Sequence, residues 1–137
     1  MKLNITKQAP NVDEFMLLRS KVGWINPESI IAQESLDNST FHVCVYAGSQ
    51  LVGFGRIVGD GSMYFYLQDV VVDPIYQEQG IGNLIMQEIE QFLEKNARSG
   101  ATIALLAACG KEKFYSKFGY SDRTGNPLGL GMCKFVE

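Results

Sequence analysis

The residues whose types and spacing most clearly suggest a functional site lie between Asp73 and Gly82. There a predicted strand runs through a short turn into a strongly amphipathic predicted helix. Successive backbone N–H groups in such a turn, and the unpaired N–H groups of the first helical turn, point toward one place. The helix dipole adds roughly half a positive charge there. Gly80 and Gly82 carry no Cβ, so a bulky diphosphate can approach the backbone. The segment therefore predicts an anion-binding site.

Two other glycine motifs do not fit. A dinucleotide-binding fingerprint requires a third glycine at the position that Ile85 occupies, and no acidic residue follows near the end of the next strand. A Walker A loop requires Gly-Lys-Ser/Thr, whereas this chain has Gly110-Lys111-Glu112. Both nucleotide-binding motifs are therefore excluded.

The turn Gln77-Glu78-Gln79-Gly80-Ile81-Gly82 resembles the Q/R-x-x-G-x-G/A signature of the GNAT acetyltransferase superfamily. A later segment, Phe114-Tyr115-Ser116-Lys117-Phe118-Gly119-Tyr120, resembles that family's FYxKxGF segment, and the element order is similar over nearly the whole chain. The resemblance implies an α/β (α+β) fold with a mixed, mostly antiparallel sheet of six to seven strands, about four flanking helices and one splayed pair of parallel strands. It also implies an N-acetyltransferase that uses acetyl-coenzyme A (acetyl-CoA).

By the same resemblance, the splayed strands are Asp69–Val72 and Thr102–Ala108, and the pantetheine arm of acetyl-CoA lies between them. An amide-bearing arm can mimic a strand, so the open ladder groups of Val70 and Val72 are expected to pair with it. A backbone N–H at the strand bulge would polarise the thioester carbonyl. The cofactor-binding residues are thus expected to be Val70, Val71, Val72, Gln77, Glu78, Gln79, Gly80, Ile81 and Gly82.

The implied reaction is direct attack on the thioester by the neutral primary amine of a small molecule, and it needs two proton transfers. Tyr115, at the family's tyrosine position, is the candidate to protonate the leaving sulfur; the alternative is a packed helical aromatic residue. Asp69 is the candidate base for the amine, because a carboxylate is unusual in an apolar strand. A structural hydrogen bond explains Asp69 equally well, and Glu28 and Glu34 are weaker candidates for the base.

The chain departs from the family pattern at Ala108, where many members carry an asparagine that helps to bind the cofactor. Cys109, beside it, is better explained by packing than as an acetyl-accepting nucleophile, because no base accompanies it. Trp24 and Tyr64 or Tyr66 could form an aromatic wall for the acceptor amine, and core packing explains these residues equally well.

The elements that position these residues follow from apolar periodicity and end signals. Four helices are predicted, at 11–22 with Asn11 as the cap, 27–36, 80–96, and 111–118 closed by Gly119. Period-two alternation and short apolar runs predict strands at 41–46, 51–58, 64–72, 102–108 and 128–136, the fourth buried on both faces.

Length and charge bound the class of protein. A chain of 137 residues fits one domain over 1–137. The net charge of −3 argues against nucleic acid as a partner, because phosphate backbones are met by dense Lys and Arg surfaces. Residues 1–75 hold five Lys or Arg and eight Asp or Glu, an excess that could attract a cationic substrate. Scattered surface acids are the more usual explanation.

No metal and no membrane partner are expected. The chain has three widely spaced cysteines, Cys44, Cys109 and Cys133, and a single histidine, His42. Their number and spacing suit neither a disulfide framework nor a zinc site. The apolar runs fall short of the roughly 20 residues of a membrane span, and no signal peptide is evident, which predicts a cytoplasmic protein. Two alternatives stay open: a non-catalytic acyl-CoA-binding or sensing module, and association through the C-terminal strands, as in a homodimer.

Overall fold

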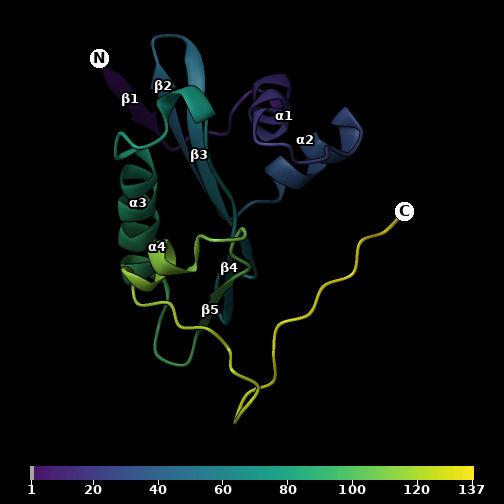
Figure 1. Ribbon diagram of the computed structural model, residues 1–137, viewed down its shortest axis with the longest axis vertical. Helices are drawn as coiled ribbons and strands as arrows, with labels where there is room; N and C mark the ends of the chain where they lie inside the picture. Colours follow the sequence, from purple (N-terminus) through teal and green to yellow (C-terminus); the bar gives the residue numbers. More distant parts are fainter. Residues whose placement is uncertain (1) are drawn as a thin grey trace. The chain divides into compact units, whose positions relative to one another are not determined.

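The computed structural model describes residues 2–137. The chain divides into two compact units, Met1–Ala104 and Leu105–Glu137. The first unit holds the sheet and three α-helices; the second holds one short helix and a tail without regular secondary structure (Figure 1). The single domain expected over 1–137 stays a prediction.

A five-stranded sheet forms the centre of the first unit. The strand order follows the chain, and each of the first four strands is antiparallel to the next. The last strand begins beside the start of the fourth, where the Thr102 N–H donates to the Met63 carbonyl at 2.8 Å, and the long helix between the two strands makes the crossover of a parallel pair. The strands are β1 (Leu3–Thr6), β2 (Phe41–Ala47), β3 (Gln50–Gly59), β4 (Tyr64–Val72) and β5 (Thr102–Leu105).

The prediction of a mixed, mostly antiparallel sheet is confirmed, but the expected count of six to seven strands is wrong. Residues 128–136, expected as a last strand, have no regular secondary structure. Gly129 and Gly131 supply no side chain to pack, which weakens a strand. Strand β5 ends before residues 106–108, and its exposed Thr102 and Ala104 show that it is not covered on both faces. Strand β1 has too few residues to show a period in the sequence.

The described residues, 2–137, form four α-helices, as predicted. Asn11 caps the first helix, where its side-chain oxygen accepts from the N–H groups of Asp13 at 2.8 Å and Glu14 at 3.3 Å. The second helix begins after Pro27 rather than at it, and the fourth is shorter than the predicted 111–118. The helices are α1 (Val12–Lys21), α2 (Ser29–Asp37), α3 (Ile81–Asn96) and α4 (Glu112–Ser116), with a 3₁₀ helix, η1 (Pro74–Tyr76).

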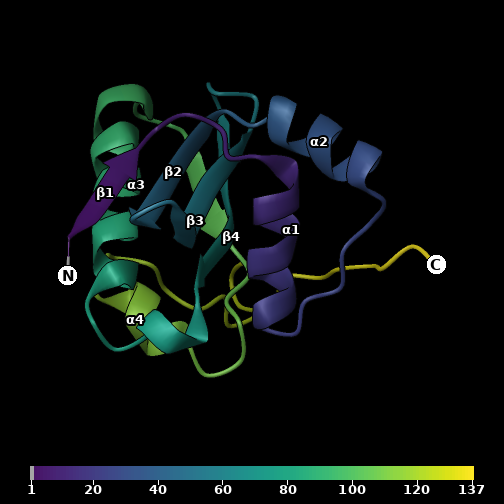
Figure 2. The same cartoon turned by 90° about the horizontal axis from the view of Figure 1, so that it is seen from above.

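Helix α3 covers one face of the sheet, and α1 and α2 cover the other (Figure 2). Two glycines of β3 allow α3 to lie close. A Cβ at Gly53 would be 2.8 Å from Ile81 Cγ2, and a Cβ at Gly55 would be 2.7 Å from Ile85 Cγ2. Both distances are shorter than real Cβ contacts. The glycines therefore seat the first turn of α3 directly on β3.

The opposite face buries an aromatic and aliphatic cluster between α1, α2 and the sheet. Phe15 of α1 meets Phe54 of β3 edge to face, with ring centroids 5.1 Å apart. The buried polar residues of the first unit are Arg56, Asp69 and Asp73. Within residues 2–137, no helix has the length and apolar character that crossing a membrane requires.

Candidate active site

The end of β4 is fixed by Asp73, which is 1% exposed. Its backbone N–H donates to the Val52 carbonyl at 2.8 Å, and its side chain caps η1 by accepting from the Ile75 N–H at 3.0 Å. Lys21 Nζ donates to the other carboxylate oxygen at 2.8 Å. Burial raises the pKa of Asp73, but the Lys21 ammonium and these hydrogen bonds outweigh burial and hold the pKa below its ordinary value. The carboxylate therefore stays charged and anchors the turn.

The turn after η1 has the backbone of an anion site. Glu78 and Gly80 have φ of +64° and +84°, and left-handed residues in a turn form concave arrangements of N–H groups. Gly80 is the N-cap of α3, and no side chain caps the helix there. The first helical bond runs from the Leu84 N–H to the Gly80 carbonyl at 3.1 Å, so the N–H groups of residues 81–83 have no partner within the helix. Residues 77–80 are exposed, so the site is open.

Gln77, the first residue of the turn, folds its side chain back onto the strand. Its Nε2 donates to the Val72 carbonyl at 3.0 Å. This hydrogen bond ties the turn to the end of β4. It also occupies one acceptor position of the Val72 carbonyl, a group that is predicted to pair with the cofactor arm.

Strand β4 contains a bulge. Its register with β3 shifts between Phe54 and Arg56, so Asp69 and Val70 together oppose Gly55. Asp69 has φ of +56°, which is uncommon for a residue with a side chain. Beyond the bulge the ladder resumes, with Val71 opposite Phe54.

The Asp69 side chain is 1% exposed and lies between two arginines. Its Oδ1 accepts from Arg19 Nη1, and its Oδ2 accepts from Arg56 Nε at 2.9 Å. Two roles were open for Asp69, a structural hydrogen-bond acceptor and a general base. These two hydrogen bonds favour the structural role.

Arg19 and Arg56 are not among the site residues predicted from the sequence. Each had a signal, because Arg19 shares the helical spacing of Val12 and Phe15, and Arg56 is the one charged residue of β3. A charged residue on an apolar stripe needs a partner. The sequence shows that need without naming Asp69 as the partner.

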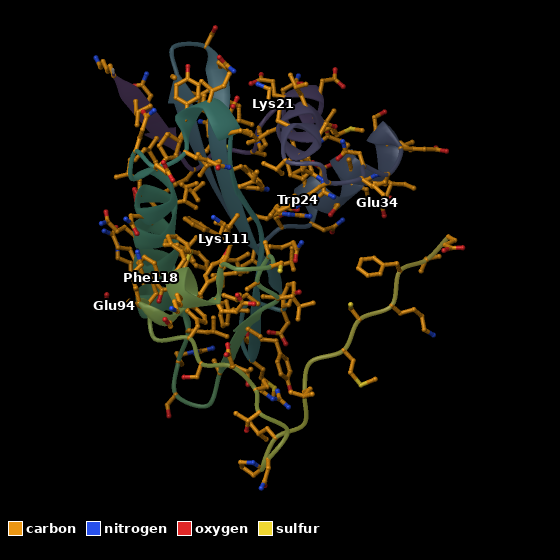
Figure 3. All side chains as sticks on the ribbon, in the orientation of Figure 1. Lys21, Trp24, Glu34, Glu94, Lys111 and Phe118 are labelled. Carbon is orange, nitrogen blue, oxygen red and sulfur yellow. The ribbon has the colours of Figure 1, made fainter. Side chains whose placement is uncertain are left out.

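The two proposed acceptor-site aromatics are not brought together. Trp24 lies beside α1 and α2 (Figure 3), is half-buried against the core cluster, and has the Arg19 guanidinium 5.4 Å from its ring. Tyr64 is 55% exposed at the start of β4, roughly 16 Å along the strand from Asp69 by the usual rise per residue. Trp24, rather than Tyr64, therefore lies next to the contact between Arg19 and Asp69.

The second unit holds a cluster of four aromatic rings that includes Tyr115. The Tyr115 ring lies 5.1 Å from Phe114 and 6.4 Å from Tyr120, and Phe114 also meets Phe118 at 5.5 Å. Burial raises the pKa of the Tyr115 phenol, which therefore stays protonated at neutral pH. A protonated phenol is a hydrogen-bond donor and a potential proton donor.

Other candidates lie at the surface. Glu28, at the N-cap of α2, and Glu34 are exposed. Cys109 is exposed as well, so the packing explanation for it is wrong: β5 ends at Leu105 and leaves Cys109 in a loop. Among residues 2–137, no three His, Cys, Asp or Glu side chains come close enough to bind a metal ion.

Comparison with known proteins agrees with this geometry. The family described as "Acetyltransferase (GNAT) domain" matches residues 20–136. The chain is 31% identical over 114 residues to the Uncharacterized N-acetyltransferase ycf52 of Pyropia yezoensis, covering 80% of this chain and 64% of that protein. It is 30% identical over 124 residues to the Uncharacterized N-acetyltransferase YjcF of Bacillus subtilis, covering 88% of this chain and 85% of that one.

A solved structure supports the same assignment. A Staphylococcus aureus protein named "Probable Acetyltransferase" superposes with a TM-score of 0.88 and 29% identity, over 98% of this chain and 100% of the other. The family match covers far more than half of the chain. The protein therefore belongs to the GNAT acetyltransferase family and is an acyltransferase.

Proposed function

We propose that this protein transfers the acetyl group of acetyl-CoA to the primary amine of a small molecule by direct attack of the amine on the thioester. The observation that carries the proposal is the start of α3, where N–H groups without helical partners follow two left-handed residues, Glu78 and Gly80. Such a site fits the pyrophosphate of acetyl-CoA because it combines N–H donors with the positive end of the helix dipole.

The edge of β4 suits the pantetheine arm. Strand β5 starts beside Met63 and has only four residues, Thr102–Leu105. At the rise of about 3.3 Å per residue, it runs beside the first part of β4 and stops before the bulge at Asp69. The ladder groups of Val70–Val72 that face away from β3 are then available to the amides of the arm. This difference in length is the proposed splay between the two parallel strands.

Acetyl-CoA supplies a thioester carbonyl and a thiol leaving group. In the proposed reaction, the amine nitrogen bonds to the carbonyl carbon and releases one proton to solvent, and the carbon–sulfur bond breaks as the tetrahedral intermediate collapses. Tyr115 donates its phenolic proton to the leaving sulfur and is then reprotonated from solvent. Its raised pKa supports this role in one respect, because the proton is present throughout the neutral pH range.

A primary amine is the proposed acceptor class. The first 75 residues hold the acidic excess of the chain, and Glu28 and Glu34 are exposed on the segment that carries α2. Trp24 places an aromatic ring next to the Arg19–Asp69 contact, where it can line an acceptor site. Exposed carboxylates and an aromatic surface both attract a substrate ammonium group before it loses its proton.

The first experiment is a calorimetric titration with acetyl-CoA of the wild-type protein, Gly80→Val and Gly100→Val. Both glycines have positive φ, +84° and +96°, and a Cβ at either meets no atom within 4 Å. The two variants therefore carry the same backbone strain, but only Gly80 belongs to the proposed site. Saturable wild-type binding that Gly80→Val weakens and Gly100→Val preserves supports the proposal. No wild-type binding at millimolar acetyl-CoA contradicts it.

The alternative is a non-catalytic acyl-CoA-binding or sensing module. Release of coenzyme A is measured with a panel of spermidine, 2-phenylethylamine, lysine and kanamycin. Turnover of any of these amines rejects the sensing module. Binding of acetyl-CoA without turnover of any member favours it.

We also propose a homodimer that pairs the C-terminal segments. The large apolar side chains of residues 128–136 are strongly exposed, as Leu128, Leu130, Met132, Phe135 and Val136 are 61–95% accessible. Contiguous exposed apolar residues mark association sites. Sedimentation at several concentrations tests this proposal, and a Met132→Asp variant that remains as dimeric as the wild type contradicts it.

A further inference from the structure

Asp69 is held too tightly to serve as a free base. Its two carboxylate oxygens accept from Arg19 and Arg56, whose side chains are 17% and 8% exposed. A hydrogen bond between ionised partners is about twice as strong as a neutral one. A substrate that approaches Asp69 as a base would have to compete with both of these bonds inside a buried cluster.

Arg56 connects Asp69 to the end of α2. Its Nη1 donates to the Ser35 carbonyl and to Ser39 Oγ, at 2.9 Å each. Its guanidinium also lies 5.7 Å from the centre of the Phe15 ring in the core. One side chain thereby joins β3, the β4 bulge and the C-terminal turn of α2.

Arg19 connects Asp69 to the loop between α1 and α2. Its Nε donates to Asn26 Oδ1 at 2.8 Å, and its Nη2 donates to the Ile25 carbonyl at 2.9 Å. The guanidinium lies 5.4 Å from the Trp24 ring. Arg19 thus links the loop that carries Trp24 to the bulge.

The backbone at Asp69 needs this support. A left-handed conformation is uncommon for a residue with a side chain, and Asp69 has φ of +56°. Strained residues persist where the surroundings over-determine them. The two arginines clamp the side chain, and the clamped side chain holds the bulge that sets the direction of the Val70 peptide.

We propose that Asp69 is a positioning residue: the Arg19–Asp69–Arg56 bridge holds the β4 bulge and the Trp24 loop in one arrangement, and acyl transfer depends on that arrangement. This inference rests on the proposed function for its kinetic part. Its structural part, the coupling of Asp69 to Trp24, is independent of any substrate.

Trp24 reports on the coupling because it is the only tryptophan of the chain. Acrylamide quenching of its fluorescence is measured for Asp69→Asn, Arg19→Met and the double variant, well below each melting temperature. Asn26 and the Trp24 N–H still bond the loop to α1, so loss of the bridge loosens the loop without releasing it, and each single variant should raise the quenching constant about twofold. The double variant should equal Arg19→Met, because Arg19→Met already removes the bridge together with the bonds from Arg19 to the loop. Asp73→Asn, a second buried carboxylate paired with Lys21 instead, is the matched control and should leave quenching unchanged.

The kinetic arm separates positioning from base catalysis. The pH profile of kcat/KM is measured with the most active amine of the panel. If Asp69 positions the site, Asp69→Asn and Arg19→Met each lower kcat by about 100-fold, the cost of a misplacement near 1 Å, and both keep the wild-type pH profile. Arg19→Lys, which keeps the charge but not the fork of donors, should recover only part of the loss.

Two results overturn the inference. One is Trp24 quenching that stays at the wild-type value in Asp69→Asn. The other is loss of the rising limb of the pH profile in Asp69→Asn while Arg19→Met retains full kcat, which makes Asp69 the base. Absence of acetyl-CoA turnover in the wild type would reject the proposed function instead, and the quenching result would still decide the bridge.

Discussion

Replacing Gly53 with alanine tests how α3 is seated, and with it the position of the anion site. The new Cβ would lie 2.8 Å from Ile81 Cγ2, 3.1 Å from Ile85 Cδ1 and 3.3 Å from Val45 Cβ. An ordinary contact begins at 3.4 Å, so the Ile81 methyl has to move by about 0.6 Å. Ile81 cannot turn away easily, because one χ1 rotamer dominates for isoleucine in helices. The first turn of α3 must move instead.

Overpacking of this kind costs about 2 kcal/mol of unfolding free energy. For a chain of 137 residues, that corresponds to a fall of roughly 7 °C in Tm. Because Ile81 is the first residue of α3, the same shift displaces the helix N-terminus, and the affinity for acetyl-CoA should fall several-fold. The assays are thermal denaturation followed by circular dichroism and calorimetric titration with acetyl-CoA.

Gly129→Ala is the matched control for Gly53→Ala. A Cβ at Gly129 meets no atom within 4 Å, and its φ lies outside the left-handed range, so unfolding free energy should change by less than about 0.5 kcal/mol. A Gly53→Ala variant that melts with the wild type would refute the close seating of α3 on β3. A destabilised variant with unchanged acetyl-CoA affinity would refute the link between that seating and the site.

Three further changes have defined outcomes. Tyr115→Phe should lower kcat by about 100-fold, the contribution of a general acid, with acetyl-CoA affinity unchanged; wild-type kcat would remove Tyr115 from the mechanism. Burial, followed by the nearby Arg56 charge, lowers the pKa of His42, so protonation favours the unfolded chain and stability should fall as pH drops below about 6.5; urea denaturation at pH 7.5 and 5.5 should show this loss, and His42→Gln should reduce it. Lys21→Met removes the cation beside Asp73 and should cost about 1–3 kcal/mol at pH 7. Because the pKa of Asp73 is lowered in the folded state, the wild-type advantage over Lys21→Met should be present above about pH 4 and disappear on further acidification; a pH-independent difference in urea denaturation would argue against the ion pair.

Local signals in the sequence determined most of the fold that surrounds the anion site. The periodicities of α1, α3 and β4, and the Asn11 cap, depend on neighbours within a few residues, so pattern alone locates them. The Gln77–Gly82 turn is also local, because Gly80 supplies the left-handed conformation that begins α3. Family membership followed from that turn and the Tyr115 segment, since both are contiguous motifs.

The tertiary structure alone decided what Asp69 does. Its partners Arg19 and Arg56 lie 50 and 13 residues away, and only the packing of α1 on the bulge of β4 brings the three together. The same holds for the position of α3 on the sheet. Ile81 and Ile85 can lie close to β3 only because Gly53 and Gly55 have no side chains. A sequence states that a carboxylate in an apolar strand must be compensated, but not by which group. The compensating group is chosen by contacts between distant segments, which exist only in the folded chain.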